Sequence, residues 1–97
     1  MAKGYWVSCY RAVHDPAALG EYAKIAGPAI QRHGGRFVAR GGTVRAYEAG
    51  LEQRTVIVEF DSVEQAIAAR ESPEYGVAMK ALGDAAERDF RIVEGVG

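Results

Sequence analysis

The sequence lacks most of the features that take a chain out of the ordinary globular class. Its one cysteine, Cys9, cannot form an internal disulfide, so a reducing compartment such as the cytoplasm is the expected location. No apolar run approaches about 18 residues and no signal-peptide pattern is present, so we expect no membrane span. The formal charge is −1, from 12 basic and 13 acidic residues mixed along the chain, and this balance predicts no binding to nucleic acid or anionic lipid.

Signature motifs of common enzyme classes are also missing. There is no GxGxxG, GxxxxGK[ST] or GxSxG, which argues against the usual nucleotide and hydrolase sites. Cys9, His14 and His33 are not spaced as CxxC, HxxxH or HExxH, so we predict no metal site and no cofactor.

What remains is a compact domain. The chain has 97 residues, of which 48% are hydrophobic and 26% charged. These values are typical of a globular protein, and the length fits a single core. We therefore treat residues 1–97 as one domain.

The best-specified unit is a strand at residues 54–60 followed at once by a helix. The strand alternates between two faces, with Val56, Val58 and Phe60 on one and Thr55, Ile57 and Glu59 on the other. Ser62 is placed as a helix N-cap with Gln65 as its capping-box partner, which predicts a helix from Val63 to about Glu71.

The other elements follow from turn residues and periodicity. Asp15-Pro16 should start a helix that ends at Gly34-Gly35, with a kink or break at Gly27-Pro28. Ser72-Pro73 should start another helix, with an apolar stripe that runs from Tyr75 to Ala86. Further strands are expected at residues 4–13, 36–40 and 88–94, and residues 43–48 should form a separate short strand or the second half of a bent one. In the strand 36–40, alternation places Phe37 and Ala39 opposite Arg36, Val38 and Arg40.

This order predicts an α+β fold of the ferredoxin-like βαββαβ type, an antiparallel sheet with helices on one face. Apolar side chains are left over for the second face, namely Tyr5, Val7, Ile57 and Val93. An exposed apolar face of that size is unfavourable on a monomer, so we predict a homodimer formed through the sheet.

A set of short motifs along the whole chain resembles one family. They are Gly4-Tyr-Trp, Asp15-Pro16, Tyr22, Gly34-Gly35-Arg36-Phe37, Arg40-Gly41-Gly42, Val58-Glu59-Phe60, Ser72-Pro73-Glu74-Tyr75 and Val93-Glu94-Gly95. In this order they are similar to the small bacterial proteins grouped as domain of unknown function 1330. The resemblance implies a dimeric α/β barrel, in which two ferredoxin-like sheets pack face to face, with relatives that include cofactor-free monooxygenases and small isomerases. It implies no particular reaction.

Two charged residues are candidates for chemistry. Glu59 should point to the enclosed face of the barrel, where a raised pKa would suit a general base; the alternative is a structural ion pair with Arg40 or Arg91. Arg40 ends a strand before two glycines, where its guanidinium can bind a substrate carboxylate; the alternative is an ion pair with Glu59 or Glu94.

Tyr22 and Tyr75 are candidates for substrate binding through their hydroxyls, although both lie on inward helix stripes where core packing explains them equally well. His33 is a weaker catalytic candidate, because a cation at a helix C-terminus also favours the helix dipole. His14 is expected in a solvated turn.

Three functions of different classes are compatible with these residues. The first is a cofactor-independent enzyme, monooxygenase- or isomerase-like, that binds a small anionic or aromatic molecule with Glu59 as base and Arg40 as orienting cation. The second is a ligand-binding or structural homodimer without turnover. The third, an RNA-recognition module, is disfavoured because Arg54-Thr-Val-Ile-Val-Glu-Phe60 has valines where stacking aromatics are needed.

Overall fold

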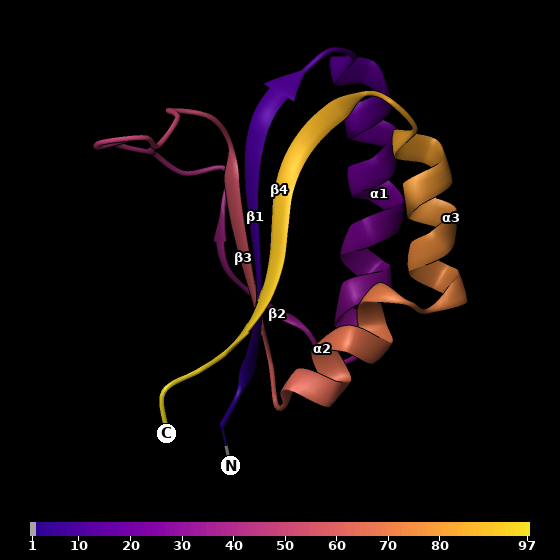
Figure 1. The fold of residues 1–97 in the computed structure, drawn as a ribbon. Helices are drawn as coiled ribbons and strands as arrows, with labels where there is room; N and C mark the ends of the chain where they lie inside the picture. The colour runs from indigo at the N-terminus through magenta and orange to yellow at the C-terminus, as the bar shows by residue number, and fades with distance from the viewer. Residues whose placement is uncertain (1) are drawn as a thin grey trace.

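A computed structural model describes residues 2–97 and contains a four-stranded sheet and three helices (Figure 1). The elements are β1 (Gly4–Val13), α1 (Pro16–Arg32), β2 (Arg36–Arg40), β3 (Thr55–Phe60), α2 (Val63–Arg70), α3 (Pro73–Leu82) and β4 (Ala86–Glu94). The strand order is β2-β3-β1-β4 and every neighbouring pair is antiparallel. The predicted ferredoxin-like α+β fold is therefore confirmed.

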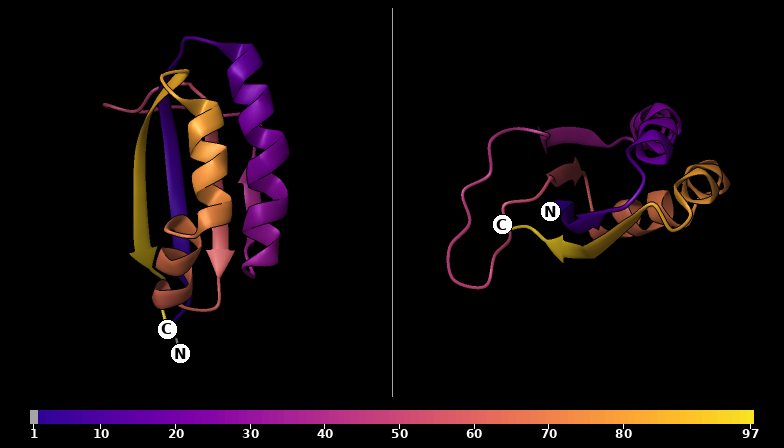
Figure 2. Two further views of the ribbon diagram at one scale, coloured as in Figure 1. Left: turned by 90° about the vertical axis from the view of Figure 1, so that its right-hand side faces the viewer. Right: turned by 90° about the horizontal axis from the view of Figure 1, so that it is seen from above.

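All three helices lie on one face of the sheet, and the core fills the space between the two layers (Figures 1 and 2). Trp6 is central: its ring contacts Phe60, Tyr75 and Phe90 at centroid distances of 5.0–5.2 Å. Its indole Nε1 donates to the Ala66 carbonyl over 2.8 Å, which fixes α2 against β1. Burial of this apolar and aromatic surface is the main stabilising term of the fold.

The helix starts are as predicted. The side chains of Asp15, Ser62 and Ser72 each accept a hydrogen bond from the backbone N–H three residues later. The capping box is only half formed, however, because the Gln65 amide donates to the His33 carbonyl over 2.8 Å and so joins α2 to the end of α1. Helix α1 ends as predicted: Gly34 has φ +85°, and the Gly35 N–H donates to the Ile30 carbonyl over 2.9 Å.

A kink or a break was expected at Gly27-Pro28, and the break was wrong, because the helix runs without interruption through Pro28. Proline removes one hydrogen bond, to the carbonyl of Lys24, and Lys24 is exposed so that water can satisfy it. Buried Ala26, Ala29 and Ile30 on the same helix hold it against the core around the proline.

The expected strand at residues 43–48 was also wrong. Residues 41–54 contain no strand and form a long loop that projects from the sheet on the side away from the helices (Figure 1). Positive φ angles at Gly41 and Glu48 turn the chain, and a turn from Tyr47 to Gly50 closes its tip. At the other end of the chain, α3 stops at Leu82 and Ala86 already belongs to β4, two residues before the predicted start.

One irregularity in the sheet changes which side chains share a face. The register between β2 and β3 shifts between Phe37 and Ala39, so that Phe37 pairs with Val58 and Arg40 with Val56. Such a bulge reverses the alternation beyond it. Arg40 therefore lies on the same face as Phe37, toward the helices, and the predicted alternation was wrong at this position.

In the part of the chain that the structure describes, no helix covers the other face of the sheet. Tyr5, Val7 and Ile57 are half-buried there and Val93 is 50% exposed. Residues near the two termini lie side by side at one end of this sheet, where the Gly95 N–H donates to the Lys3 carbonyl over 2.7 Å. Within residues 2–97, no helix is both long and apolar enough to span a membrane.

Candidate functional site

The candidate site is a small cleft between α1 and the helix-facing side of the sheet. Its cavity volume is about 40 Å³. The floor comes from β1, β3 and β4, one wall from α1, and the rim from the ends of β2 and β3. Its polar lining residues are Ser8, Tyr10, Tyr22, Arg40, Arg54 and Arg88.

The strand pairing arranges the floor of the cleft as two adjacent rows of side chains. The first row runs Arg40, Val56, Ser8, Phe90 across all four strands. The second runs Arg54, Tyr10, Arg88, because the Tyr10 N–H donates to the Arg54 carbonyl and Tyr10 pairs with Arg88. Ser8 thus has Arg54 and Arg88 as diagonal neighbours, at the about 7–8 Å that this relation gives between Cα atoms.

The three arginines have aromatic neighbours and no acidic ones. The Arg40 guanidinium lies 4.1 Å from the centroid of the Phe37 ring. Those of Arg54 and Arg88 lie 5.8 and 5.6 Å from the centroid of Tyr10. Within residues 2–97 none of the three arginines makes an ion pair, and no carboxylate lines the cleft. The cleft is therefore electropositive in a protein whose formal charge is −1.

Two buried polar atoms of the cleft residues have no hydrogen-bond partner within residues 2–97. They are the Ser8 hydroxyl and the Nε of Arg54. Ser8 is 3% exposed, so its hydroxyl has no access to bulk water. Buried polar groups are normally satisfied, and these two mark the cleft as a place where a polar group from outside the chain is expected.

Tyr22 and Tyr75 form a buried pair at the inner end of the cleft. Their hydroxyl oxygens lie 2.6 Å apart, and Arg88 Nη1 donates to the Tyr22 hydroxyl over 3.1 Å. Burial, and then the neighbouring Tyr75, raise the pKa of Tyr22 above its ordinary value. Tyr22 lines the cleft and stays a phenol at neutral pH. Tyr75, 1% exposed, does not line the cleft and supports Tyr22 from behind.

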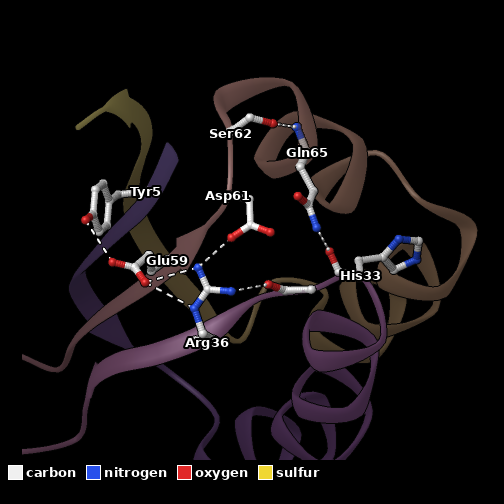
Figure 3. A network of polar contacts seen from close by, with 8 residues as sticks. Tyr5, His33, Arg36, Glu59, Asp61, Ser62 and Gln65 are labelled. Carbon is white, nitrogen blue, oxygen red and sulfur yellow. Dashed lines mark hydrogen bonds and ion pairs between the residues drawn. The ribbon is translucent and has the colours of Figure 1, made fainter. Parts of the chain in front are cut away.

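Glu59 does not line this cleft, because it lies on the opposite face of the sheet. Its carboxylate accepts hydrogen bonds from the Tyr5 hydroxyl at 2.9 Å and from Arg36 at 3.1 Å, and Asp61 shares the same guanidinium (Figure 3). The hydrogen bond from Tyr5, followed by that from Arg36, lowers the pKa of Glu59. The carboxylate forms an ion pair, with Arg36 and not with the expected Arg40 or Arg91, and the expected rise of its pKa was wrong.

His33 also lies outside the cleft. It caps the C-terminus of α1, where its backbone carbonyl accepts from Gln65 (Figure 3) and its Nε2 lies 3.1 Å from the Glu74 carboxylate at the start of α3. Here it links the ends of two helices. His14 is exposed, as expected, and its Nε2 lies 3.0 Å from Glu87. Within the part of the chain that the structure describes, no group of three His, Cys, Asp or Glu residues could hold a metal ion.

The structure thus brings Arg40 and Tyr22 together and separates them from Glu59 and His33. It adds three residues that sequence reasoning did not single out, Ser8, Arg54 and Arg88. Arg54 and Arg88 are the first residues of the strands expected at 54–60 and 88–94. Ser8 is one polar position in a mostly apolar strand. Their common signal is position on one sheet face, which becomes readable only once the pairing of distant strands is known.

The sequence pattern described as domain of unknown function DUF1330 matches residues 3–96. The chain belongs to the DUF1330 family. Among curated proteins, none matches this DUF1330 chain in sequence. Family membership confirms the resemblance drawn from the short motifs, and it carries no reaction with it.

Solved structures similar to this DUF1330 protein share its fold at low sequence identity. The RPA0582 protein of unknown function from Rhodopseudomonas palustris has a TM-score of 0.78 at 17% identity, over 99% of this chain and 84% of that one. SnoaB, a cofactor-independent oxygenase from Streptomyces nogalater, has a TM-score of 0.65 at 15% identity, over 100% and 96% of the two chains. A dimeric ferredoxin-like protein of unknown function from Thermobifida fusca has a TM-score of 0.57 at 13% identity, over 96% and 91%.

Proposed function

We propose that this protein binds a small organic anion in the cleft between α1 and the sheet. The observation that carries the proposal is the convergence of Arg40, Arg54 and Arg88 on one cavity, which no carboxylate of the described residues lines. Guanidinium groups remain charged at any physiological pH. Like charges that share a partly desolvated cavity are unfavourable unless an anion balances them, and an anion placed among them gains from all three.

The aromatic and apolar walls of the cleft define the rest of the ligand. Tyr10, Phe37 and Phe90 surround the arginines together with apolar side chains of α1 and β3. Pockets for small molecules combine such apolar walls with a few convergent polar groups. A carboxylate attached to an apolar body fits this combination better than inorganic phosphate.

A thermal-shift screen with carboxylates, phenols and quinones tests this function. A ligand present at about 100 times its Kd should stabilise the fold by about 2.7 kcal/mol. In a domain of this size, each kcal/mol of stabilisation raises the Tm by about 4–8 °C. We expect carboxylates to raise the Tm, and Arg54→Gln to abolish the rise.

Arg32→Gln is the matched control, since Arg32 is exposed at the end of α1 and outside the cleft. Carboxylate binding that survives Arg54→Gln and Arg40→Gln, or that Arg32→Gln weakens equally, would refute the cleft as the site. If no anion raises the Tm of the folded protein, the anion-binding function is refuted and a structural homodimer remains as the function.

A homodimer through the uncovered sheet face is part of the proposal, with the cytoplasm as its compartment. The half-buried and exposed apolar side chains of that face support it, and the Thermobifida fusca protein of this fold is a dimer. Glu59, Tyr5 and Arg36 would lie within this interface. Glu59 can therefore act as a general base only on a molecule held between two protomers. A monomeric mass in solution would contradict the dimer.

Catalysis without a cofactor is the second candidate function, and the Tyr22–Tyr75 pair favours it. A phenol held by Arg88 and Tyr75 at the cleft can donate a hydrogen bond to negative charge that develops on a bound ligand. The fold shared with SnoaB supports the idea by analogy alone. Its test is turnover of any anion found in the screen, in buffer with chelator and without added cofactor. Turnover should fall in Tyr22→Phe while the Kd of the anion changes little.

A further inference from the structure

We infer that the ligand is a short-chain aliphatic monocarboxylate whose carboxylate sits over Ser8. This inference rests on the proposed function and narrows it in two respects: where the anionic group lies, and how large the attached body is. It is drawn from the two rows of side chains on the cleft floor and from the size of the cavity.

Ser8 lies at the centre of the arginine cluster. It shares a row with Arg40, two strands away, and has Arg54 and Arg88 on its two diagonals. Among the residues of these two rows, Ser8 is the one that has two of the arginines on its diagonals and the third in its own row. An anion centred above Ser8 is therefore the arrangement that uses all of the cationic groups together.

The hydrogen-bonding capacity at this point matches a carboxylate. The buried Ser8 hydroxyl and Arg54 Nε–H are both donors without a partner within residues 2–97. Arg88 is already engaged, because its Nη1 donates to Tyr22 and its Nη2 to the Met79 sulfur, so it contributes charge more than new hydrogen bonds. Two free donors suit the two oxygens of one carboxylate.

The cavity is too small for an aromatic acid to enter fully. Its volume is about 40 Å³, whereas one water needs roughly 10–15 Å³ on this kind of measure and a dry cavity that binds benzene has about 150 Å³. A space of this size suits a carboxylate on a short carbon chain better than one on an aromatic ring. The aromatic side chains of the walls then act as cation–π partners of the arginines, with ring centroids 4.1–5.8 Å from the guanidinium carbons.

Isothermal titration calorimetry on the full chain, with lactate, lactamide, benzoate and inorganic phosphate as probes, tests this inference. Lactate should bind, and lactamide, which has nearly the same shape but no charge, should not. Benzoate and phosphate should bind at least about tenfold more weakly than lactate. Ser8→Ala should weaken lactate binding by about five- to tenfold, which is the usual value of one hydrogen bond.

Ser8→Ala has a second signature that separates a ligand contact from a structural role. Because it removes a buried hydroxyl that has no partner in the protein, it should leave the Tm of the free protein unchanged or raise it. Cys9→Ala is the control, as the next residue of the same strand on the opposite face. A lower Tm with unchanged lactate affinity would mean that Ser8 is satisfied in another way, and would overturn the inference.

The remaining outcomes distinguish the inference from the function on which it rests. Benzoate or phosphate that binds as tightly as lactate, and that Arg54→Gln releases, would refute the short monocarboxylate while the anion cleft stands. Absence of binding for all three anions would refute the function itself.

Discussion

Arg36 lies directly across from Glu59 in neighbouring strands, and its Nε donates to the Glu59 carboxylate over 3.1 Å. The same carboxylate accepts from Tyr5 on the other side, so one acidic group joins β2, β3 and β1 on the face that no helix covers (Figure 3). This network lies near one end of that face, which also carries the ion pair between Asp89 and Arg91 beside Cys9 and Val7. Charge at such a position fixes the register of strands and of any partner that packs there.

Glu59→Gln should make stability less dependent on pH in acid. The pKa of Glu59 is lowered in the fold, chiefly by Tyr5 and then by Arg36, from an unfolded value of about 4.3. Its stabilisation is thus fully present above that value and is lost as the pH falls through the lowered folded value. Urea unfolding between about pH 3 and pH 7 measures this. Glu52→Gln, in the exposed loop, is the control, and equal acid slopes for the two variants would contradict the prediction.

Tyr22→Phe should destabilise the protein more than Tyr75→Phe. Removal of the Tyr22 hydroxyl leaves the Tyr75 hydroxyl and Arg88 Nη1 without this hydrogen-bond partner, at a cost of about 1–3 kcal/mol, while Tyr75→Phe leaves Tyr22 bonded to Arg88 and should cost about 1 kcal/mol. Denaturant midpoints give both values. Tyr47→Phe, 73% exposed, should stay within about 0.5 kcal/mol. The reverse order of the two buried tyrosines would show that Arg88 finds another partner.

Gly4→Ala should destabilise the fold by about 1–3 kcal/mol. A Cβ at this position would lie 2.5 Å from the Ser62 carbonyl oxygen and 2.7 Å from the Val63 Cα, and these are backbone atoms that hold the start of α2. Gly76→Ala in α3 is the opposite case, with nothing within 4 Å of its Cβ, and should stabilise by about 0.5–1 kcal/mol. Thermal unfolding distinguishes the two, and Gly4→Ala with a wild-type Tm would contradict this packing.

Val93→Lys should convert the proposed dimer to a folded monomer. Val93 is 50% exposed on the uncovered sheet face, where a partner would desolvate the new charge. Light scattering measures the mass, and circular dichroism verifies the fold. Val77→Lys on α3, at 56% exposed, serves as control and should keep the mass of the wild type. Equal masses for both variants would place the interface elsewhere.

The sequence was sufficient to predict the elements that depend on neighbouring residues. The caps at Asp15, Ser62 and Ser72 and the stop at Gly34 depend on a few neighbouring residues, and the structure has each of them. The family motifs likewise gave the fold. The failures at Pro28 and at residues 43–48 have one cause in common: whether a helix continues or a strand finds a partner depends on packing with distant parts of the chain.

The candidate site was less predictable for a related reason. One bulge between Phe37 and Ala39 moves Arg40 to the helix side of the sheet, away from Glu59 with which it had been grouped. Arg54 and Arg88 join it only because β3 and β4 both pair with β1 beside Ser8 and Tyr10. The sequence of a single strand does not determine these neighbours, because register is a property of two paired strands.

The hydrogen bond between Gly95 and Lys3 means that the two ends of the fold adjoin each other. A short peptide linker across this junction would close the chain into a ring without disturbing the sheet, and the projecting loop at residues 41–54 offers a natural place to open it again. The resulting circular permutant would begin near Gly50 and end near Ala49, with every strand pair preserved. In this permutant Arg54 would lie near the N-terminus and Arg40 near the C-terminus. Only folding would bring the two arginines together at the cleft.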